Sequence, residues 1–231
     1  MKPQIFPDAY AVSKAAAALI AKEARDAVSA RGRFVMAVSG GKTPWQMLRD
    51  LATEDMPWSD VHVLQVDERI APAGDPDRNL THLCESLLAN APIPPENIHG
   101  MPVENSDAGE ACFQYTETLN SLCGNPPLLD LVHLGLGPDG HTASLIPGDP
   151  VCGVRDAEVA LTGIYQNRRR LTLTYPVLNR ARRILWVVTG AEKAPMVPRM
   201  LAGDPFIPAG PVEQKHAILF LDASAAESIA D

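Results

Sequence analysis

Short apolar runs recur along the chain, and each ends at a glycine or at polar and charged side chains. They are the segments 34–38, 61–66, 130–134, 184–190 and 216–221. The stretches between them space their apolar residues as amphipathic helices do. Strands that alternate with helices predict a parallel sheet covered by helices on both faces. We therefore expect a doubly wound α/β fold, a Rossmann-like three-layer arrangement with a mostly parallel sheet.

The expected helices have recognisable ends. The first is the Ala-rich segment Ala11–Val28, which Gly32 closes. Two further segments, 159–162 and 170–174, alternate apolar and polar residues and predict a short antiparallel addition to the sheet. No internal repeat or long linker divides the chain, so residues 1–231 are expected to form a single domain. The other helices are expected at 44–52, 80–90, 107–122 and 191–200, with a last one after Asp222.

The composition narrows the classes of partner. Hydrophobic residues make up 46% of the chain, enough to bury a full core, and the net charge of −8 gives an isoelectric point of about 5.2. This charge argues against nucleic acid or an anionic membrane as the main partner. An acidic protein binds a phosphorylated ligand only through a local cluster of Lys, Arg and backbone N–H groups.

Cysteine usage and the N-terminus indicate where the protein works. Cys84, Cys112, Cys123 and Cys152 have no C-x-x-C spacing, and no histidine is placed so as to suggest a zinc site, which predicts free buried thiols. The chain begins without a basic segment followed by an apolar core, and no apolar run reaches about 18 residues. These features predict a soluble, cytoplasmic protein with no membrane partner.

A glycine-rich loop, Gly135–Gly148, follows the expected strand 130–134. Ligands of open α/β sheets gather at such strand ends, and glycine lets the backbone approach a ligand closely. Asp139 and His141 stand two residues apart in this loop, and a neutral imidazole is suited to moving protons near pH 7. The alternative is a glycine-rich turn with a surface histidine.

A second glycine turn, Ser39–Pro44, follows the strand 34–38. Thr43 is expected to cap a helix whose first residue is Pro44. A strand, a glycine turn and a helix N-terminus together predict an anion site, because free N–H groups and the positive end of the helix dipole face the ligand. The spacing is that of neither a Walker A loop nor a dinucleotide-binding loop. The alternative is an ordinary strand-to-helix turn.

Charged residues mark three further places. Asp67-Glu68-Arg69 ends a strand, and Arg69 is expected to bind a phosphate while Asp67 acts as a base or holds a sugar hydroxyl. Lys193 follows another strand end, and Arg170 is expected to point inward. Arg168 and Arg169 are interpreted as solvated turn charges. Because parallel strands end at one edge of a sheet, these groups predict one site, and the motifs contain no metal-ligand set.

Several of these motifs, in this order, resemble those of the glucosamine-6-phosphate isomerase/6-phosphogluconolactonase superfamily, and most closely its lactonase branch. The strings are SGGKTP, VDER, GLGPDGHTASLIPG, RLTLT and TGAEKA, within residues 35–194. The resemblance implies that His141 is the catalytic histidine, with Asp67 and Asp139 near it. Lys42 stands where many relatives have serine. The resemblance further implies that the phosphate and substrate contacts come from Gly40, Gly41, Lys42, Thr43, Arg69, Arg170 and Lys193.

The activity implied by the resemblance is hydrolysis of 6-phosphoglucono-1,5-lactone to 6-phosphogluconate in the oxidative pentose phosphate pathway. His141 would activate water, and the Gly40–Gly41 turn with Arg69 and Lys193 would hold the phosphate. No cofactor or metal is implied, and the partner is a small phosphorylated sugar lactone.

Two alternatives stay open: a glucosamine-6-phosphate isomerase/deaminase, and a non-catalytic sugar-phosphate-binding regulator of the same fold. Deaminases of the superfamily carry a glutamate five residues after the histidine, where this chain has Ile146, and an aromatic residue in place of Arg69. Both departures favour the lactonase.

Overall fold

A computed structural model describes residues 1–229. Its main sheet has the strand order β1-β10-β9-β6-β2-β3-β5, and every neighbouring pair is parallel. The strands are β1 (Pro3–Phe6), β2 (Phe34–Val38), β3 (Val61–Gln65), β5 (Ile98–His99), β6 (Leu131–Leu134), β9 (Ile184–Val188) and β10 (Ala217–Asp222). The predicted parallel sheet is confirmed, and the sequence analysis missed only its two edge strands, β1 and β5.

A small antiparallel sheet joins the main one. It has the order β4-β8-β7, with β4 at Asp67–Arg69, β7 at Val159–Leu161 and β8 at Arg170–Leu173. The predicted antiparallel pair is confirmed, but β4 was expected only as the charged end of a strand. Val66 links the two sheets, because its N–H donates to the carbonyl of Val38 and its carbonyl accepts from Leu173.

The turn between β7 and β8 is centred just before Arg168 and Arg169, the two residues interpreted as turn charges. Tyr165 and Arg168 exchange both backbone hydrogen bonds, at 3.0 and 3.2 Å, around Gln166 and Asn167. Both central residues have positive φ, 50° and 63°, as a tight type I′ hairpin turn requires. The interpretation of Arg168 as a solvated turn charge is wrong, because its guanidinium pairs with carboxylates of the loop that precedes α3.

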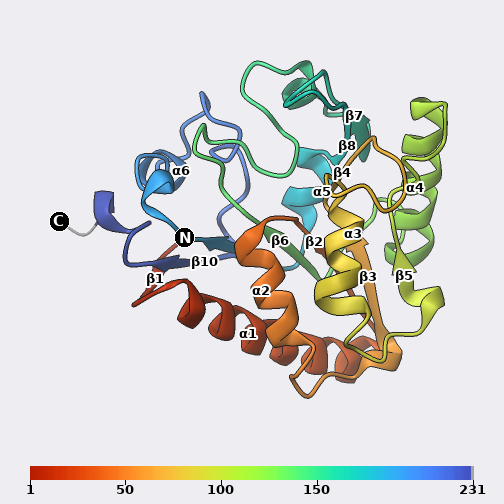
Figure 1. Ribbon diagram of the computed structural model, residues 1–231, viewed down its shortest axis with the longest axis horizontal. Coiled ribbons are helices and arrows are strands. Elements are labelled where there is room, and N and C mark those ends of the chain that lie inside the picture. The colour runs from red at the N-terminus through yellow and green to blue at the C-terminus, as the bar shows by residue number, and fades with distance from the viewer. Residues whose placement is uncertain (230–231) are drawn as a thin grey trace.

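Helices cover both faces of the main sheet (Figure 1). Their bounds are α1 (Ala9–Arg31), α2 (Lys42–Leu51), α3 (Asn79–Leu83, continued by a π-helical turn to Leu88), α4 (Ala108–Cys123), α5 (Tyr175–Arg180) and α6 (Val197–Leu201). Short 3₁₀ segments occupy 58–60, 95–97, 150–153, 191–193 and 227–229. Gly32 ends α1 with a φ of 77°, as predicted.

Three expected helix boundaries are wrong. The helix expected at 191–200 is two short pieces, because Pro195 and Pro198 have no N–H to donate within a helix. α2 begins at Lys42 after Gly41, so Thr43 lies inside the helix instead of capping it. In the described part of the chain, Asp222 is followed by turns and the segment Glu227–Ile229, not by the expected longer helix.

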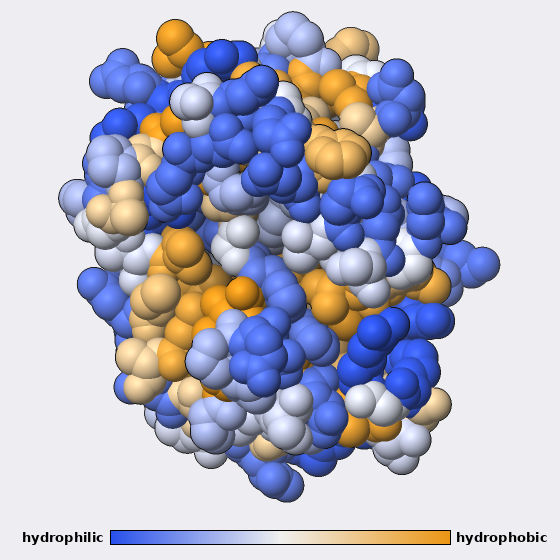
Figure 2. All heavy atoms as spheres, turned by 90° about the vertical axis from the view of Figure 1, so that its right-hand side faces the viewer, coloured by the Kyte–Doolittle hydropathy of each residue, from blue (hydrophilic) through white to orange (hydrophobic). Residues whose placement is uncertain are grey.

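Two apolar cores confirm the three layers. Ile20 of α1, Met47 of α2 and Leu87 after α3 pack on one face of the sheet. Tyr115 of α4, Val177 of α5 and Met200 of α6 pack on the other. The side of the molecule that carries α4 is mostly hydrophilic, with apolar residues in patches between the polar ones (Figure 2).

Two further sequence expectations concern the thiols and the membrane. All four cysteines are free, but Cys84 is exposed and the other three are half-buried, so the expectation of buried thiols holds only in part. No helix in residues 1–229 combines the length and hydropathy needed to cross a bilayer.

Candidate active site

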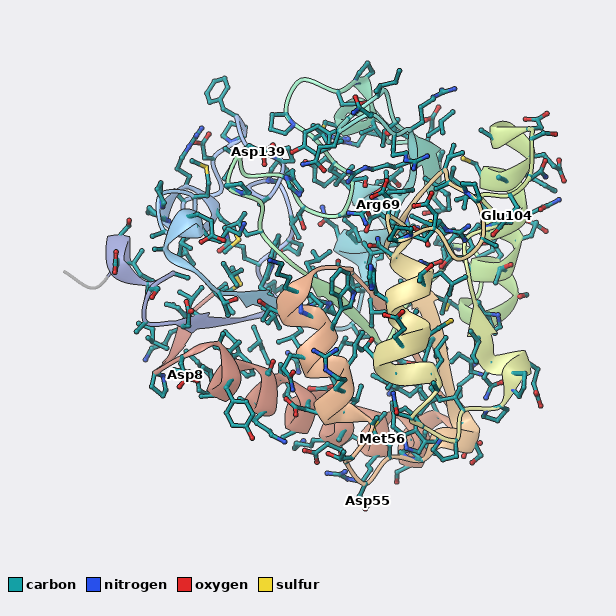
Figure 3. The ribbon with its side chains drawn as sticks, viewed as in Figure 1. Asp8, Asp55, Met56, Arg69, Glu104 and Asp139 are labelled. Carbon is teal, nitrogen blue, oxygen red and sulfur yellow. The ribbon has the colours of Figure 1, made fainter. Side chains whose placement is uncertain are left out.

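A cavity of about 330 Å³ opens at the carboxyl ends of β2, β6 and β9. The strand order diverges there, since β3 and β5 lie on one side of β2 and β6, β9 and β10 on the other. Ligands of open α/β sheets bind at such a point. Nine predicted residues line the cavity: Gly40, Gly41, Lys42, Thr43, Asp67, Arg69, His141, Arg170 and Lys193. Asp139, the tenth predicted site residue, contacts His141. In Figure 3, Asp139 and Arg69 lie toward one end of the molecule and Asp55 lies at the opposite end.

The glycine turn presents the N-terminus of α2 to this cavity. No side chain caps the ten-residue helix, so its first N–H groups remain available to an anion. Gly41 has a φ of 128°, which side chains rarely adopt. A Cβ on Gly40 would lie 2.0 Å from Oδ1 of Asn79, so only glycine fits there. Thr43 does not cap α2. Its hydroxyl forms a hydrogen bond of 2.5 Å with the hydroxyl of Thr189, which fixes α2 to the end of β9.

Two arginines face each other across the antiparallel ladder. Arg69 of β4 pairs in register with Arg170 of β8, and neither guanidinium forms an ion pair with a carboxylate among residues 1–229. In both, Nε is buried without a hydrogen-bond partner. Burial and the charge of Arg69 lower the pKa of Arg170. Two neighbouring cations that are not ion-paired form a site for an anion.

Neutral and backbone acceptors hold these guanidiniums in place. Nη1 of Arg69 donates to the carbonyl of Asp77 at 2.8 Å and to Oδ1 of Asn79 at 2.9 Å. Nη2 of Arg170 donates to Oε1 of Gln166 at 3.0 Å. These contacts orient the charges without neutralising them.

Two lysines add positive charge to the cavity wall. Lys42 lies at the start of α2, and Lys193 lies beyond β9 with Nζ 3.4 Å from Oε1 of Glu192. Both are placed to reach a bound anion, and Glu192 also lines the cavity. No group of three or more His, Cys, Asp or Glu side chains within residues 1–229 is arranged to hold a metal ion.

His141, which lines the cavity, forms a close pair with Asp139. Nδ1 of His141 lies 2.6 Å from Oδ1 of Asp139, which also accepts the backbone N–H of His141 at 3.1 Å. Burial opposes ionisation of Asp139, but these hydrogen bonds and the nearby imidazole hold its pKa below the ordinary value. An ionised carboxylate only accepts hydrogen bonds, so in the neutral imidazole Nδ1 carries the proton and Nε2 keeps the lone pair.

Gly137 makes room for the histidine. A Cβ at this position would lie 2.1 Å from Nδ1 of His141 and 2.7 Å from Oδ1 of Asp139. Gly140, with a φ of 84°, packs against Ile207 in the same way. The glycines of the motif therefore set where the imidazole lies, which the sequence predicted only in general terms.

The three charges of Asp67-Glu68-Arg69 separate in the structure. Successive side chains of a strand point to opposite faces, so Asp67 and Arg69 face the cavity while Glu68 turns away. Glu68 is fully buried, forms an ion pair with Arg78, and accepts hydrogen bonds from Gln65 and several backbone N–H groups. The grouping of Glu68 with the site is therefore wrong, and its carboxylate organises the loop before α3.

Asp67 itself is held by hydrogen bonds. Its Oδ2 accepts the hydroxyl of Ser144 at 2.6 Å, and its Oδ1 accepts Nδ2 of Asn79 at 3.3 Å. Both partners are buried. These bonds leave Asp67 at the cavity wall with a fixed orientation, whereas the contact to His141 comes from Asp139.

Sequence reasoning missed two residues of the site. Asn79 contacts Gly40, Arg69 and Asp67, and its place directly before a predicted helix was a weak signal for such a role. Tyr165 contacts Asp139, and a single aromatic residue at a hairpin turn gave no signal.

The chain matches known proteins over most of its length. Residues 7–220 match the family model described as glucosamine-6-phosphate isomerases/6-phosphogluconolactonase. A 6-phosphogluconolactonase of Nostoc sp. is 35% identical over 203 residues, which cover 86% of this chain and 84% of that protein. The crystal structure of 6-phosphogluconolactonase from Thermotoga maritima superposes with a TM-score of 0.85 at 27% identity, over 95% of this chain and 98% of that one.

A monomeric glucosamine-6-phosphate deaminase also shares the fold. Its TM-score is 0.86 at 19% identity, over 99% of this chain and all of that one (100%). Fold similarity therefore extends to both activities, and residues of the site have to distinguish them. From the extent of the family match and the identity to the Nostoc protein, the chain belongs to the glucosamine-6-phosphate isomerase/6-phosphogluconolactonase family.

Proposed function

We propose that the protein hydrolyses 6-phosphoglucono-1,5-lactone to 6-phosphogluconate. The observation that carries this proposal is one cavity that joins two arginines without ion-pair partners and an open helix N-terminus to an imidazole with a free Nε2. The first group suits a phosphate and the second suits activation of water. The names of the relatives at 35% and 27% identity support the same reaction.

Binding begins with the phosphate. The N–H groups at Gly41 and the start of α2, with Arg69, Arg170 and Lys193, bind the phosphate of the substrate. This contact anchors the substrate away from its reacting carbon. The ring then extends across the cavity and brings its C1 carbonyl toward His141.

The chemical step needs one base that later acts as an acid. Nε2 of His141 removes a proton from water, and the oxygen of that water bonds to C1 of the lactone. The bond from C1 to the ring oxygen then breaks, and the imidazolium returns the proton to that oxygen. Asp139 stabilises the imidazolium through the 2.6 Å contact to Nδ1. A positioned acid/base of this kind accelerates a reaction by about 10²–10⁴-fold.

The deaminase alternative lacks a supporting carboxylate. The position five residues after His141 is Ile146, which is buried and apolar. Arg69 stands where deaminases carry an aromatic residue, and here it belongs to the arginine pair. An isomerase has to move a proton between C2 and C1, whereas hydrolysis needs only a base for water. We therefore favour the lactonase.

One experiment decides among the alternatives. The pure protein is incubated separately with freshly made 6-phosphogluconolactone and with glucosamine 6-phosphate, while acid and ammonia are followed. We expect rapid acid release above the spontaneous rate and no ammonia. Ammonia release at a comparable rate identifies a deaminase, and binding of both sugars without turnover identifies a silent regulator.

Several further statements stay predictions from the sequence. They are that the chain acts as one domain without a metal or cofactor, and that it works in the cytoplasm.

A further inference from the structure

Tyr165 contacts two residues that line the cavity, His141 and Arg170. Tyr165 is half-buried and lies at the turn of the β7–β8 hairpin, outside every motif that the sequence analysis used. Its hydroxyl lies 3.3 Å from Oδ2 of Asp139, and its ring meets the ring of His141 edge-to-face at 5.8 Å. On the same ring, Cζ of Arg170 lies 5.0 Å from the centroid. One side chain thus contacts both the imidazole pair and a phosphate-binding arginine.

We infer that Tyr165 is a positioning residue that fixes Asp139 and Arg170 relative to one another. This inference rests on the proposed function and deepens it.

The hydroxyl of Tyr165 acts on the catalytic pair. Because Asp139 is ionised, it accepts from Tyr165 through Oδ2 while Oδ1 accepts from His141. The side chain of Asp139 is 36% exposed, so few other contacts prevent its rotation. The bond to Tyr165 holds the carboxylate in the plane that keeps Nε2 of His141 directed toward the substrate.

The ring of Tyr165 acts on the arginine. Arg170 lacks a carboxylate partner in the described chain, and its hydrogen bond to Gln166 comes from the same hairpin turn. A guanidinium over an aromatic face gains cation–π attraction without losing its charge. The ring therefore holds Arg170 in place while leaving it free to bind phosphate.

Two substitutions separate these roles. Tyr165→Phe keeps the ring and removes the hydroxyl, so we expect kcat to fall by about 2–10-fold with KM unchanged, as expected for one lost hydrogen bond. Tyr165→Ala removes both, so the KM for the phosphorylated lactone also rises by about 3–10-fold. The KM for unphosphorylated gluconolactone stays as in the wild type. Ile164→Ala, at the exposed neighbouring position, leaves both constants unchanged.

Binding of the product gives a readout independent of turnover. By calorimetry, Tyr165→Ala is expected to weaken binding of 6-phosphogluconate by about 3–10-fold, and Tyr165→Phe and Ile164→Ala leave it unchanged. Wild-type kinetics in Tyr165→Phe, or an equal rise in the KM of both lactones in Tyr165→Ala, overturns the inference. If the wild type binds 6-phosphogluconate but hydrolyses neither lactone, the proposed function fails, and the calorimetry alone decides whether Tyr165 positions Arg170.

Discussion

At the scale of single residues, the site depends on small groups that leave space for large ones. Gly137 leaves room for the ring of His141, and Gly40 leaves room for the amide of Asn79. Asp139 then fixes the tautomer of His141 through a single short contact. The reactive nitrogen is therefore placed by the backbone and by one carboxylate.

Replacing His141 tests this placement. An asparagine cannot take a proton from water, so we expect His141→Asn to lower kcat by about 10²–10⁴-fold with little change in KM. The temperature of unfolding should stay near that of the wild type, because the ring lines an open cavity. The matched control is His216→Asn, at an exposed histidine outside the cavity. Turnover near the wild-type rate in His141→Asn would remove this residue from the mechanism.

At the scale of secondary-structure elements, the pairing of β4 with β8 creates the arginine pair. The two strands lie about a hundred residues apart in sequence, and the ladder places Arg69 opposite Arg170. Like charges opposite one another are unfavourable in a sheet unless a ligand compensates them. The small sheet therefore acts as part of the anion site.

Removing one cation of this pair should affect the phosphorylated substrate selectively. A lost hydrogen bond to a charged group costs about 1.5–3 kcal/mol, so Arg69→Ala should lower kcat/KM for 6-phosphogluconolactone by about 10–150-fold. The change for unphosphorylated gluconolactone should be much smaller. Arg182→Ala, which removes the same charge at the amino end of β9, is the control and should leave both values unchanged. Equal losses for both lactones would show that Arg69 does not bind the phosphate.

At the scale of the whole molecule, the net charge is −8, yet four cationic side chains lie together in one cavity. Lys42, Arg69, Arg170 and Lys193 line it together with two carboxylates, Asp67 and Glu192. The overall charge repels polyanions, while the cavity attracts a small anion. This distribution is consistent with the small phosphorylated partner that the motifs at the strand ends predicted.

The core beneath the cavity contains a histidine that makes stability depend on pH. His133 of β6 is fully buried, its Nδ1 accepts the N–H of Ser39 at 3.3 Å, and its Nε2 has no partner in the described chain. Burial lowers its pKa from 6.5 to about 3. Between these values the unfolded chain binds a proton that the folded protein does not bind. The free energy of unfolding therefore falls as the pH drops below about 6.5.

The pH dependence can be measured by urea unfolding between pH 7 and pH 4. The wild type should lose up to ~1.4 kcal/mol per pH unit more than His133→Asn, because one proton separates its folded and unfolded states. His62 and His99, whose pKa values burial also lowers, remain in both proteins and cancel in the difference. Parallel curves for the two proteins would show that His133 is not the group that titrates.

The sequence was most informative where the signal is local. Apolar runs, Gly32 after α1 and the glycines after β2 and β6 predicted the parallel strands, one helix end and the edge of the sheet that carries the cavity. Boundaries failed where a proline or a turn acts against helical periodicity, as it does at Pro195 and Pro198.

What the sequence by itself determined is the parallel α/β sheet and the strand ends that carry its ligand groups, because side-chain period, glycine and helix ends act over a few residues. Only the tertiary structure decided that Arg69 lies opposite Arg170, that Glu68 faces away from the cavity, and that Tyr165 contacts Asp139. These contacts join segments far apart in the chain, and their register depends on which faces are buried when the sheets pack.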